Sequence, residues 1–295
     1  MYFFALASPA LVLLTLFLLA PAVLTFVIAF TDLDYRFNWN FVGFENFIRI
    51  IRDPLTVTIL TNTAIFVSGT LAFNVGMGLF LALLSTSLRE TTGTFLRAAW
   101  LLPRIMPSVV FAFSMTWFFS PLETGTLNQI LTLLQAGQVA FTKDYPWPFL
   151  FLLNGFVGCS LGMVVFSSAI KSIPQDIINA ARADGASGTA IAIKIIIPLI
   201  RWQIAFITAY QTLSLLTSFE YILLTLDGGP GYYTTEVWVL HAYHRAFSEY
   251  QLAALYGYAS ALISFLAGIG IVASLIYWRV FRLKELIAEP KIEVY

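Results

Sequence analysis

Residues 149–170 read FLFLLNGFVGCSLGMVVFSSAI, a run of 22 residues without any Asp, Glu, Lys or Arg. A helix rises 1.5 Å per residue, so about 20 apolar residues cross the roughly 30 Å of hydrocarbon in a bilayer. The run is therefore long enough to be a transmembrane helix. Its apolar character is continuous and does not alternate from one residue to the next, which favours a helix over a strand of a membrane barrel.

Other runs of similar length and composition precede and follow it. We expect transmembrane helices over residues 3–30, 61–84, 98–119, 149–170, 204–226 and 252–277. The first has no basic residue before it and exceeds the roughly 7 to 15 apolar residues of a signal-peptide core, so we interpret it as a retained span. The sequence thus predicts an all-α, polytopic membrane protein in which residues 1–295 form a single transmembrane domain.

The composition agrees with this class and excludes others. Hydrophobic residues make up 59% of the chain and charged residues 11%, against roughly 25% charged residues in soluble domains. Sixteen basic residues balance sixteen acidic ones, so no basic stripe is available and no nucleic-acid partner is expected. The lone cysteine, Cys159, cannot form an intrachain disulfide. His241 and His244 have no carboxylate or third nitrogen ligand at an evident spacing, so no metal site is expected.

Basic residues set the expected orientation. Six spans place both termini on one side of the membrane, and eleven of the sixteen Lys and Arg then lie on that side. We therefore expect both termini in the cytoplasm. On the outside, residues 40–54 carry apolar residues at helical spacing (Phe44, Phe47, Ile48 and Ile51), which predicts a helix lying at the interface, either as a lid or as a ligand contact. Residues 227–231, DGGPG, predict a tight turn, followed by a helix over 235–247.

The inner segment 171–199 reads KSIPQDIINAARADGASGTAIAIKIIIPL. Ser172 followed by Gln175 is a capping-box pattern, so we expect a helix to start there. It should break near Asp184 and Gly185, and small residues keep it slim. Connections between helices usually have about 2 to 8 residues, and this segment is long enough to hold two short helices of its own. The segment either docks into a partner or rests on the underside of the bundle.

Residues 179–198 carry a resemblance to a known family. Ala180 and Ala181, then Gly185, and Ile195 three residues before Pro198 resemble the cytoplasmic EAA loop of binding-protein-dependent ABC importers. Further matches, in order, to the sugar permease subunits of the maltose-type importers are VGFENF at 42–47, LLP at 101–103, SP and G-x-L-N within 120–128, IP at 173–174 and GGP at 228–230. The resemblance covers about residues 9–280, and it favours the MalF-like half of the permease pair.

The resemblance implies a six-transmembrane-helix ABC importer permease fold with a cytoplasmic coupling helix, in the plasma membrane. The implied partners are a second, MalG-like permease subunit, two ATP-binding cassette ATPase subunits and an extracytoplasmic sugar-binding protein. The chain would not itself be an enzyme and would bind no cofactor. It has no GxxxxGK[ST] phosphate loop, so ATP and Mg would be bound by the ATPase partner.

Two sets of site residues follow. The residues implied in coupling to the ATPase lie in a coupling loop over 172–194 and just after it, and they are Asn179, Ala180, Ala181, Asp184, Gly185 and Pro198. Asn179 replaces the glutamate that opens the family's loop, so a charged contact is not expected there. The candidate substrate path consists of Asn154, Phe156, Gly158, Gln211, Ser214, Ser218 and Glu220.

The path residues rest on different arguments. Asn154 and Gly158 match positions that line the sugar site in the family, and Phe156 could stack on a pyranose. At 1.5 Å per residue, Asn154 and Ser218 should both lie roughly 8 to 12 Å below the outer surface. Alternatively, the hydroxyls bond their own helix and Asn154 pairs with a neighbouring one. For Glu220, gating, substrate contact and helix pairing all remain open.

The expected function is half of the translocation path for a neutral mono- or oligosaccharide, because the spans offer amides, hydroxyls and aromatic rings but no basic cluster. The alternative is a secondary transporter or channel driven by an ion gradient, which would commonly show inverted repeats and several buried charges. An intramembrane enzyme would need HExxH, GxSxG or paired aspartates. The sequence has no HExxH and no paired aspartates within its spans, and its GCSLG at 158–162 lies inside a continuous apolar run and not at a strand-to-helix turn.

Overall fold

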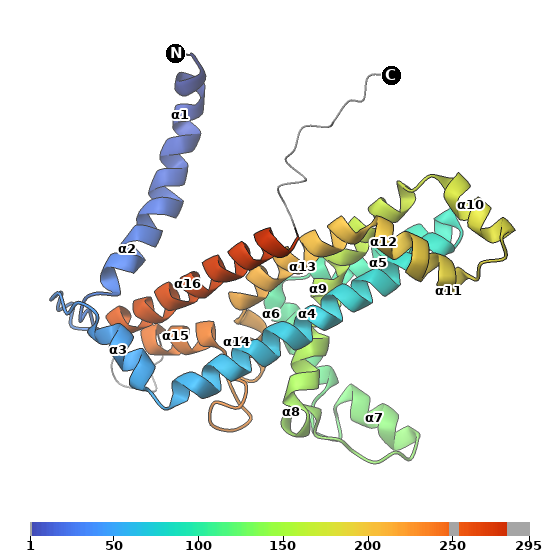
Figure 1. Ribbon diagram of the computed structural model, residues 1–295. Coiled ribbons are helices and arrows are strands. Elements are labelled where there is room, and N and C mark those ends of the chain that lie inside the picture. The colour runs from blue at the N-terminus through green and yellow to red at the C-terminus, as the bar shows by residue number, and fades with distance from the viewer. Residues whose placement is uncertain (1, 248–253, 282–295) are drawn as a thin grey trace. The chain divides into compact units, whose positions relative to one another are not determined.

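The computed structural model describes residues 2–247 and 254–281, and their regular structure is helical apart from one isolated bridge between Thr31 and Phe41 (Figure 1). Four helical segments are long and apolar enough to cross a membrane without a sharp bend: Ala7–Ile28, Leu55–Ser87, Pro146–Lys171 and Tyr256–Val280. Two bent pairs also qualify, so the number of candidate spans rises to six if each pair is one span. The predicted all-α membrane architecture is confirmed.

The chain divides into two compact units. Unit 1 comprises Met1–Asn62 and Glu236–Ile271, and unit 2 comprises Thr63–Thr235 and Val272–Tyr295. Helices α4 (Leu55–Ser87) and α16 (Tyr256–Val280) each contribute residues to both units.

Unit 1 contains the first apolar segment, which runs through α1 (Tyr2–Leu14), the π-helical turn η1 (Thr15–Leu19) and α2 (Ala20–Ile28). Its most apolar stretch is 0% buried within the chain, as expected of a segment whose neighbours are lipid or another subunit. Unit 1 also holds α3 (Glu45–Arg52) and α15 (Trp238–Phe247).

Helix α3 is the helix predicted at the outer interface. Asn46 is buried, and its amide donates to the carbonyls of Ala29 and Thr31 at 2.9 and 2.8 Å. Ile50 is also buried. The predicted apolar stripe instead faces outward, with Phe44, Ile48 and Ile51 being 69%, 45% and 76% exposed. An interfacial helix has this arrangement when its apolar side is turned to lipid.

Unit 2 is built around the close approach of α4 and α9 (Pro146–Lys171). The two helices run parallel, because side chains meet in step along both of them. Phe151 occupies the space over Gly69, and Phe73 the space over Gly155. Nearer their ends, the hydroxyls of Ser85 and Ser167 are 3.3 Å apart. The glycines allow the two helices to approach each other closely, as small residues do in many membrane helix pairs.

The remaining helices of unit 2 alternate in direction. Helix α5 (Glu90–Ile105) is antiparallel to α9, since Glu90 meets Lys171 while Trp100 meets Cys159. Helix α13 (Arg201–Leu216) is also antiparallel to α9, because Gln211 bonds Gly158 while Ile200 packs at Ala169. Because α4 and α9 are parallel, the chain must return between them, and α5 runs in the required direction.

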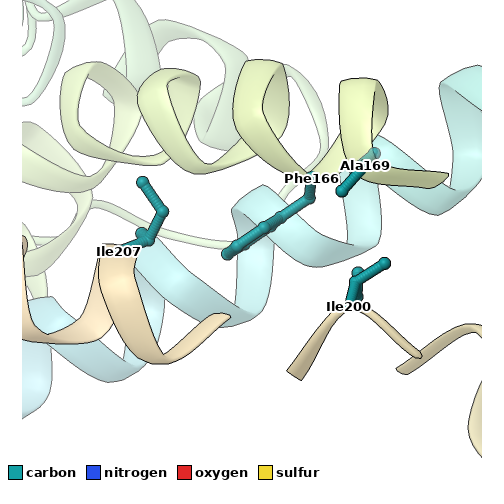
Figure 2. Packing of buried hydrophobic residues seen from close by; sticks show 5 residues of the cluster. Phe166, Ala169, Ile200 and Ile207 are labelled. Atoms are coloured by element: carbon teal, nitrogen blue, oxygen red, sulfur yellow. The ribbon is translucent and has the colours of Figure 1, made fainter. Parts of the chain in front are cut away.

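A buried cluster joins α4, α9 and α13. Figure 2 shows Phe166 and Ala169 of α9 beside Ile200 and Ile207, the residue before α13 and one within it. Phe166 and Ile207 are fully buried, and Ala82 of α4 completes the cluster. Close-packed side chains of this kind hold the helices together where lipid leaves no hydrophobic driving force between them.

Two predicted spans are broken in the structure. The span predicted over 98–119 consists of α5 and α6 (Ser108–Phe118), which meet at 101°. Met106 is extended (φ −69°, ψ 142°) because it precedes Pro107, which disfavours the helical conformation of the residue before it. The span predicted over 204–226 consists of α13 and α14 (Glu220–Thr225), separated by residues 217–219. The Thr217 hydroxyl donates to the Ser214 carbonyl at 3.0 Å and closes the end of α13.

The remaining described elements are short. They are α7 (Thr126–Leu133), α8 (Phe141–Asp144), α10 (Gln175–Ala183), α11 (Gly188–Ile191), the π-helical turn η2 (Ala192–Ile196) and α12 (Ile197–Leu199). Residues 227–231 form the predicted turn, in which Asp227 and Gly228 have φ of 49° and 80°. The helix predicted over 235–247 starts later, at Trp238.

The glycine packing generates a prediction. A Cβ on Gly158 would lie 2.1 Å from the amide nitrogen of Asn74, so Gly158→Ala should force α4 and α9 apart. Overpacking of this kind costs about 1 to 3 kcal/mol. We expect a lower melting temperature for the purified subunit, and Asn74→Ala in the same chain should recover part of it. Gly76→Ala on α4 is the control, because its Cβ meets nothing within 4 Å. Equal melting temperatures for the two alanine variants would contradict the packing argument.

Candidate functional site

The predicted coupling loop, residues 172–194, is called the coupling segment from here on. It begins without the predicted capping box. The Ser172 hydroxyl donates back to the Ala169 carbonyl at 2.7 Å, and the Gln175 amide points forward to Asn179 at 3.5 Å. Helix α10 starts at Gln175 after Pro174, which is extended (φ −55°, ψ 127°) and makes no side-chain cap. The capping-box prediction is therefore wrong, because Ser172 is still part of the end of α9 and proline alone sets the start of α10.

The predicted break near Asp184 and Gly185 is confirmed. The Gly185 amide donates to the Arg182 carbonyl, and the Ala186 amide donates to the Ala181 carbonyl, both at 3.0 Å. Gly185 itself has φ +79°, which is the left-handed conformation that ends many helices. After it, the Ser187 hydroxyl accepts from the Ala190 amide at 3.2 Å and starts α11.

Helix α10 has two different faces. One face carries Gln175, Ile178 and Arg182, which line a cavity against the ends of α4 and α9, and Ile178 is 9% exposed. The other face is open: Asn179, Ala180, Asp184 and Gly185 are exposed, and Ala181 is half-buried. Five of the six predicted coupling residues thus lie together at the end of unit 2 where α4 and α9 end (Figure 1).

Pro198 is not part of this group. It lies in α12, at the start of the path from the coupling segment to α13, and it lines a separate cavity that also contacts Val280 and Phe281. Its helix meets α13 at Ile200, where the axis bends by 70°. Pro198 is therefore placed at the joint between the coupling segment and the next span.

Charged groups hold the base of the coupling segment. The Lys171 ammonium lies 2.7 Å from a carboxylate oxygen of Glu90, and the Arg97 guanidinium lies 3.3 Å from the same oxygen. These pairs join the end of α9 to the start of α5. Since Glu90 is exposed, each pair contributes little to stability and mainly defines geometry.

The candidate path residues divide into two groups. Asn154 and Ser218 meet, as their predicted common depth requires: the amide nitrogen and the hydroxyl are 3.5 Å apart. Ser218 lies in the break before α14. Glu220 opens α14, and its carboxylate accepts a hydrogen bond from Ser108, the first residue of α6. Both helix breaks therefore come together at one layer of polar side chains.

Gln211 and Gly158 form a second group that joins helices. Asn74 donates to the Gln211 side-chain oxygen at 2.7 Å, and Gln211 donates to the Gly158 carbonyl at 2.9 Å. Asn74 is fully buried and Gln211 is 5% exposed. This group links α4, α9 and α13, and it places Gly158 against Asn74. The path role of Gln211 and Gly158 stays a prediction.

Two further path residues stand apart from both groups. Phe156 is stacked on Trp100, with ring centroids 5.6 Å apart and an interplanar angle of 14°, so one of its faces is already occupied. Ser214 is exposed, and its carbonyl accepts from the Thr217 hydroxyl. Neither observation tests contact with a solute, and both assignments stay predictions.

The sequence reasoning missed three polar residues. Asn74 lies in the middle of the apolar segment 61–84, and Ser108 follows Pro107 within a predicted span. A polar residue inside a span costs free energy unless it has a partner, so the polar character of Asn74 and Ser108 within apolar runs could have identified both. The third residue, Glu236, lies 2.9 Å from His244 Nδ1 and 3.4 Å from His241 Nδ1, and it is 2% exposed.

Glu236 is a carboxylate near the two histidines that spacing did not indicate. Burial of Glu236 raises the pKa of its carboxyl group. Hydrogen bonds to His241 and His244, together with the positive charges of these two side chains, have a larger effect in the opposite direction and hold the pKa below its ordinary value. Among the residues that the structure describes, no group of three or more His, Cys, Asp or Glu is arranged to hold a metal ion.

Comparison with known proteins connects these features to a family. The model of the family described as "binding-protein-dependent transport system inner membrane component" matches residues 74–283, which include the polar layer and the whole coupling segment. The chain belongs to this family. A probable ABC transporter permease protein of Pyrococcus horikoshii is 30% identical, with 92% of each chain covered. The alternative of an ion-gradient-driven transporter is thereby set aside.

Two further relatives extend the comparison. The sulfoquinovosyl glycerol transport system permease protein SmoG of Agrobacterium fabrum is 26% identical over 95% of this chain and 90% of the relative. A chain of a bacterial alginate ABC transporter, solved in complex with an alginate pentasaccharide-bound periplasmic protein, has a TM-score of 0.82 at 24% identity and covers 95% of this chain and 94% of its own. The second similarity shows the fold of this permease. In this family the permease is a non-catalytic inner-membrane component that depends on a binding protein.

Proposed function

We propose that this chain forms half of the translocation path for a neutral carbohydrate in an ATP-driven importer. A second permease subunit would form the other half. Two ATPase subunits would bind ATP and Mg, and an external binding protein would deliver the solute. The observation that carries the proposal is the meeting of two helix breaks at Asn154, Ser218, Ser108 and Glu220 in a chain of this family.

The polar layer has the chemistry that a carbohydrate needs. A sugar offers hydroxyls that donate and accept, and the layer offers an amide, two hydroxyls and a carboxylate. Polar groups inside spans are retained mainly where they serve a path or a pair. The relatives named for sulfoquinovosyl glycerol and alginate support a carbohydrate as the class of solute, but alginate is an acidic polysaccharide, so they do not support a neutral one. Glu220 would repel an acidic solute, which favours a neutral one here.

The coupling segment supplies the connection to ATP. Helix α10 is proposed to dock into an ATPase subunit through its open face, on which Ala180 lies exposed and Ala181 half-buried. Asn179 has no charge, so the docking would depend on shape at this position. Because α11, η2, α12 and α13 follow α10 in this order along the chain, movement of α10 would reach the polar layer through α13.

Solute choice can be tested on the reconstituted complex with its binding protein. A panel of neutral and acidic sugars should show ATPase stimulation by a neutral member. Asn154→Leu should then lower uptake of that sugar about fivefold to a hundredfold, because a stranded hydroxyl costs about 1 to 3 kcal/mol. Leu152→Ala, on the same helix, is the matched control. Full uptake by Asn154→Leu at equal levels of intact complex would remove Asn154 from the path, and stimulation by acidic sugars alone would contradict the neutral solute.

Coupling can be tested at the end of α10. Gly185 has φ +79°, where an L residue costs about 1 kcal/mol or more, so Gly185→Val should distort the C-terminal end of α10 and abolish uptake while the subunit still assembles. Gly188→Val is the control, because Gly188 lies at ordinary φ and its Cβ meets nothing within 4 Å. Uptake and assembly of both variants are compared with the unaltered chain. Normal uptake by Gly185→Val would rule out the coupling role.

The orientation with both termini in the cytoplasm is tested by labelling. In a Cys159→Ala background, cysteine is introduced at Tyr232, which is fully exposed after the DGGPG turn, or at Leu88, which is 40% exposed between α4 and α5. A membrane-impermeant thiol reagent should label Tyr232→Cys in intact cells and Leu88→Cys only after permeabilisation. The reverse pattern would invert the proposed topology.

A further inference from the structure

A cavity of about 680 Å³ lies between the coupling segment and the ends of two spans. Its walls include Phe80 and Leu84 of α4, Lys171 at the end of α9, and Gln175 and Arg182 of α10. The volume falls within the roughly 300 to 1,000 Å³ typical of ligand pockets. All of the lining residues belong to unit 2.

The walls of the cavity are apolar on one side and polar on the other. Phe80 and Leu84 are 57% and 38% exposed and lie in the last turns of α4, where the span approaches its polar end. Ser87, Lys171 and Gln175 lie beyond them, at or after the ends of the spans. The cavity therefore straddles the level at which hydrocarbon gives way to headgroups.

The charges on the walls are all of one sign. The lining contains two cations, Lys171 and Arg182, and no Asp or Glu. The Lys171 ammonium has Glu90 as its partner, and Glu90 does not line the cavity. Among the residues that the structure describes, none forms an ion pair or hydrogen bond with the side chain of Arg182. An anion in the cavity would complement both cations.

We propose that this cavity binds an anionic glycerophospholipid, with its phosphate at Arg182 and Lys171 and the upper part of its acyl chains along Phe80 and Leu84. This assignment rests on the proposed function, which places the coupling segment at the cytoplasmic leaflet. Anionic lipids are attracted to basic residues at that surface. A free phosphate would leave the apolar wall uncovered, which is why a lipid is the better occupant.

The position of Arg182 separates this site from the proposed ATPase contact. Gln175, Ile178 and Arg182 repeat at helical spacing on the face of α10 that lines the cavity, whereas Ala180 and Asp184 are exposed on the opposite face. A lipid in the cavity would therefore lie behind α10 and fill the space between it and the spans. It would act as a packing element that keeps α10 in place for docking.

The test uses the intact complex, purified in detergent with added palmitoyl-oleoyl phosphatidylglycerol, and native mass spectrometry to count bound lipid. We expect phosphatidylglycerol to be retained in preference to phosphatidylcholine with the same acyl chains. Arg182→Gln should lower the retained fraction about fivefold, the factor expected for one basic residue at an anionic surface. Leu83→Trp should also lower it, because it fills the cavity without changing any charge.

Arg89→Gln is the matched control, because Arg89 is exposed on the α4–α5 connection and does not line the cavity. Equal retention by Arg182→Gln and Arg89→Gln, or no preference for phosphatidylglycerol, would overturn the proposal. Displacement of the lipid by about 10 mM inorganic phosphate would show that the ligand is a free phosphate and overturn it too. The readout is bound lipid, so an unaltered complex that takes up its solute but retains no phosphatidylglycerol would refute this inference alone. An unaltered complex that retains the lipid but takes up no sugar would refute the proposed function alone.

Discussion

The close approach of α4 and α9 is the constraint on which the rest of unit 2 depends. Lipid is as apolar as the helices themselves, so no hydrophobic driving force brings them together. Their association therefore depends on close packing and interhelical hydrogen bonds. Here Gly69 and Gly155 receive phenylalanine rings from the opposite helix, and Gly78 lies against the backbone of α9 at Cys159. Asn74 then reaches Gln211, which ties α13 to the same pair. The positions of α9 and α13 therefore both depend on this contact.

Apolar runs long enough to span could be located from the sequence because hydrocarbon thickness sets a minimum length that a sequence displays directly, and four of the six predicted runs are single long helices. The breaks within them could be predicted only in part. Pro107 is visible in the sequence and explains the extended Met106. Nothing comparable marks residues 217–219, where no proline or glycine occurs and the end of α13 depends on the Thr217 hydroxyl. Hydroxyls that bond their own backbone occur in many unbroken helices, so they identify a break only after it has been seen.

The candidate site residues could also be predicted only in part from the sequence. Depth along a helix can be counted from the sequence, and the count placed Asn154 and Ser218 at one level, where the structure has them 3.5 Å apart. The neighbour that a side chain meets across a helix pair depends on rotation and register, which spacing does not give. For this reason, the sequence could not show that Gly158 faces Asn74 or that Ser108 meets Glu220. At the coupling segment, the left-handed Gly185 was predictable from its residue type, whereas the role of Ser172 depended on where α9 ends.

Helix α13 connects the two proposed sites mechanically. It follows directly on the coupling segment after the bend at Ile200, and it ends beside Ser218 at the polar layer. Its 16 residues span about 24 Å, which is most of the thickness of the hydrocarbon core. Ile207 is fully buried beside Phe166, and Gln211 bonds α9, so the helix is held along its length and behaves as one body. In the proposed mechanism a displacement at α10 would reach the break before α14 through α13, because the two breaks of this segment, Ile200 and residues 217–219, lie at the ends of α13, one facing each proposed site.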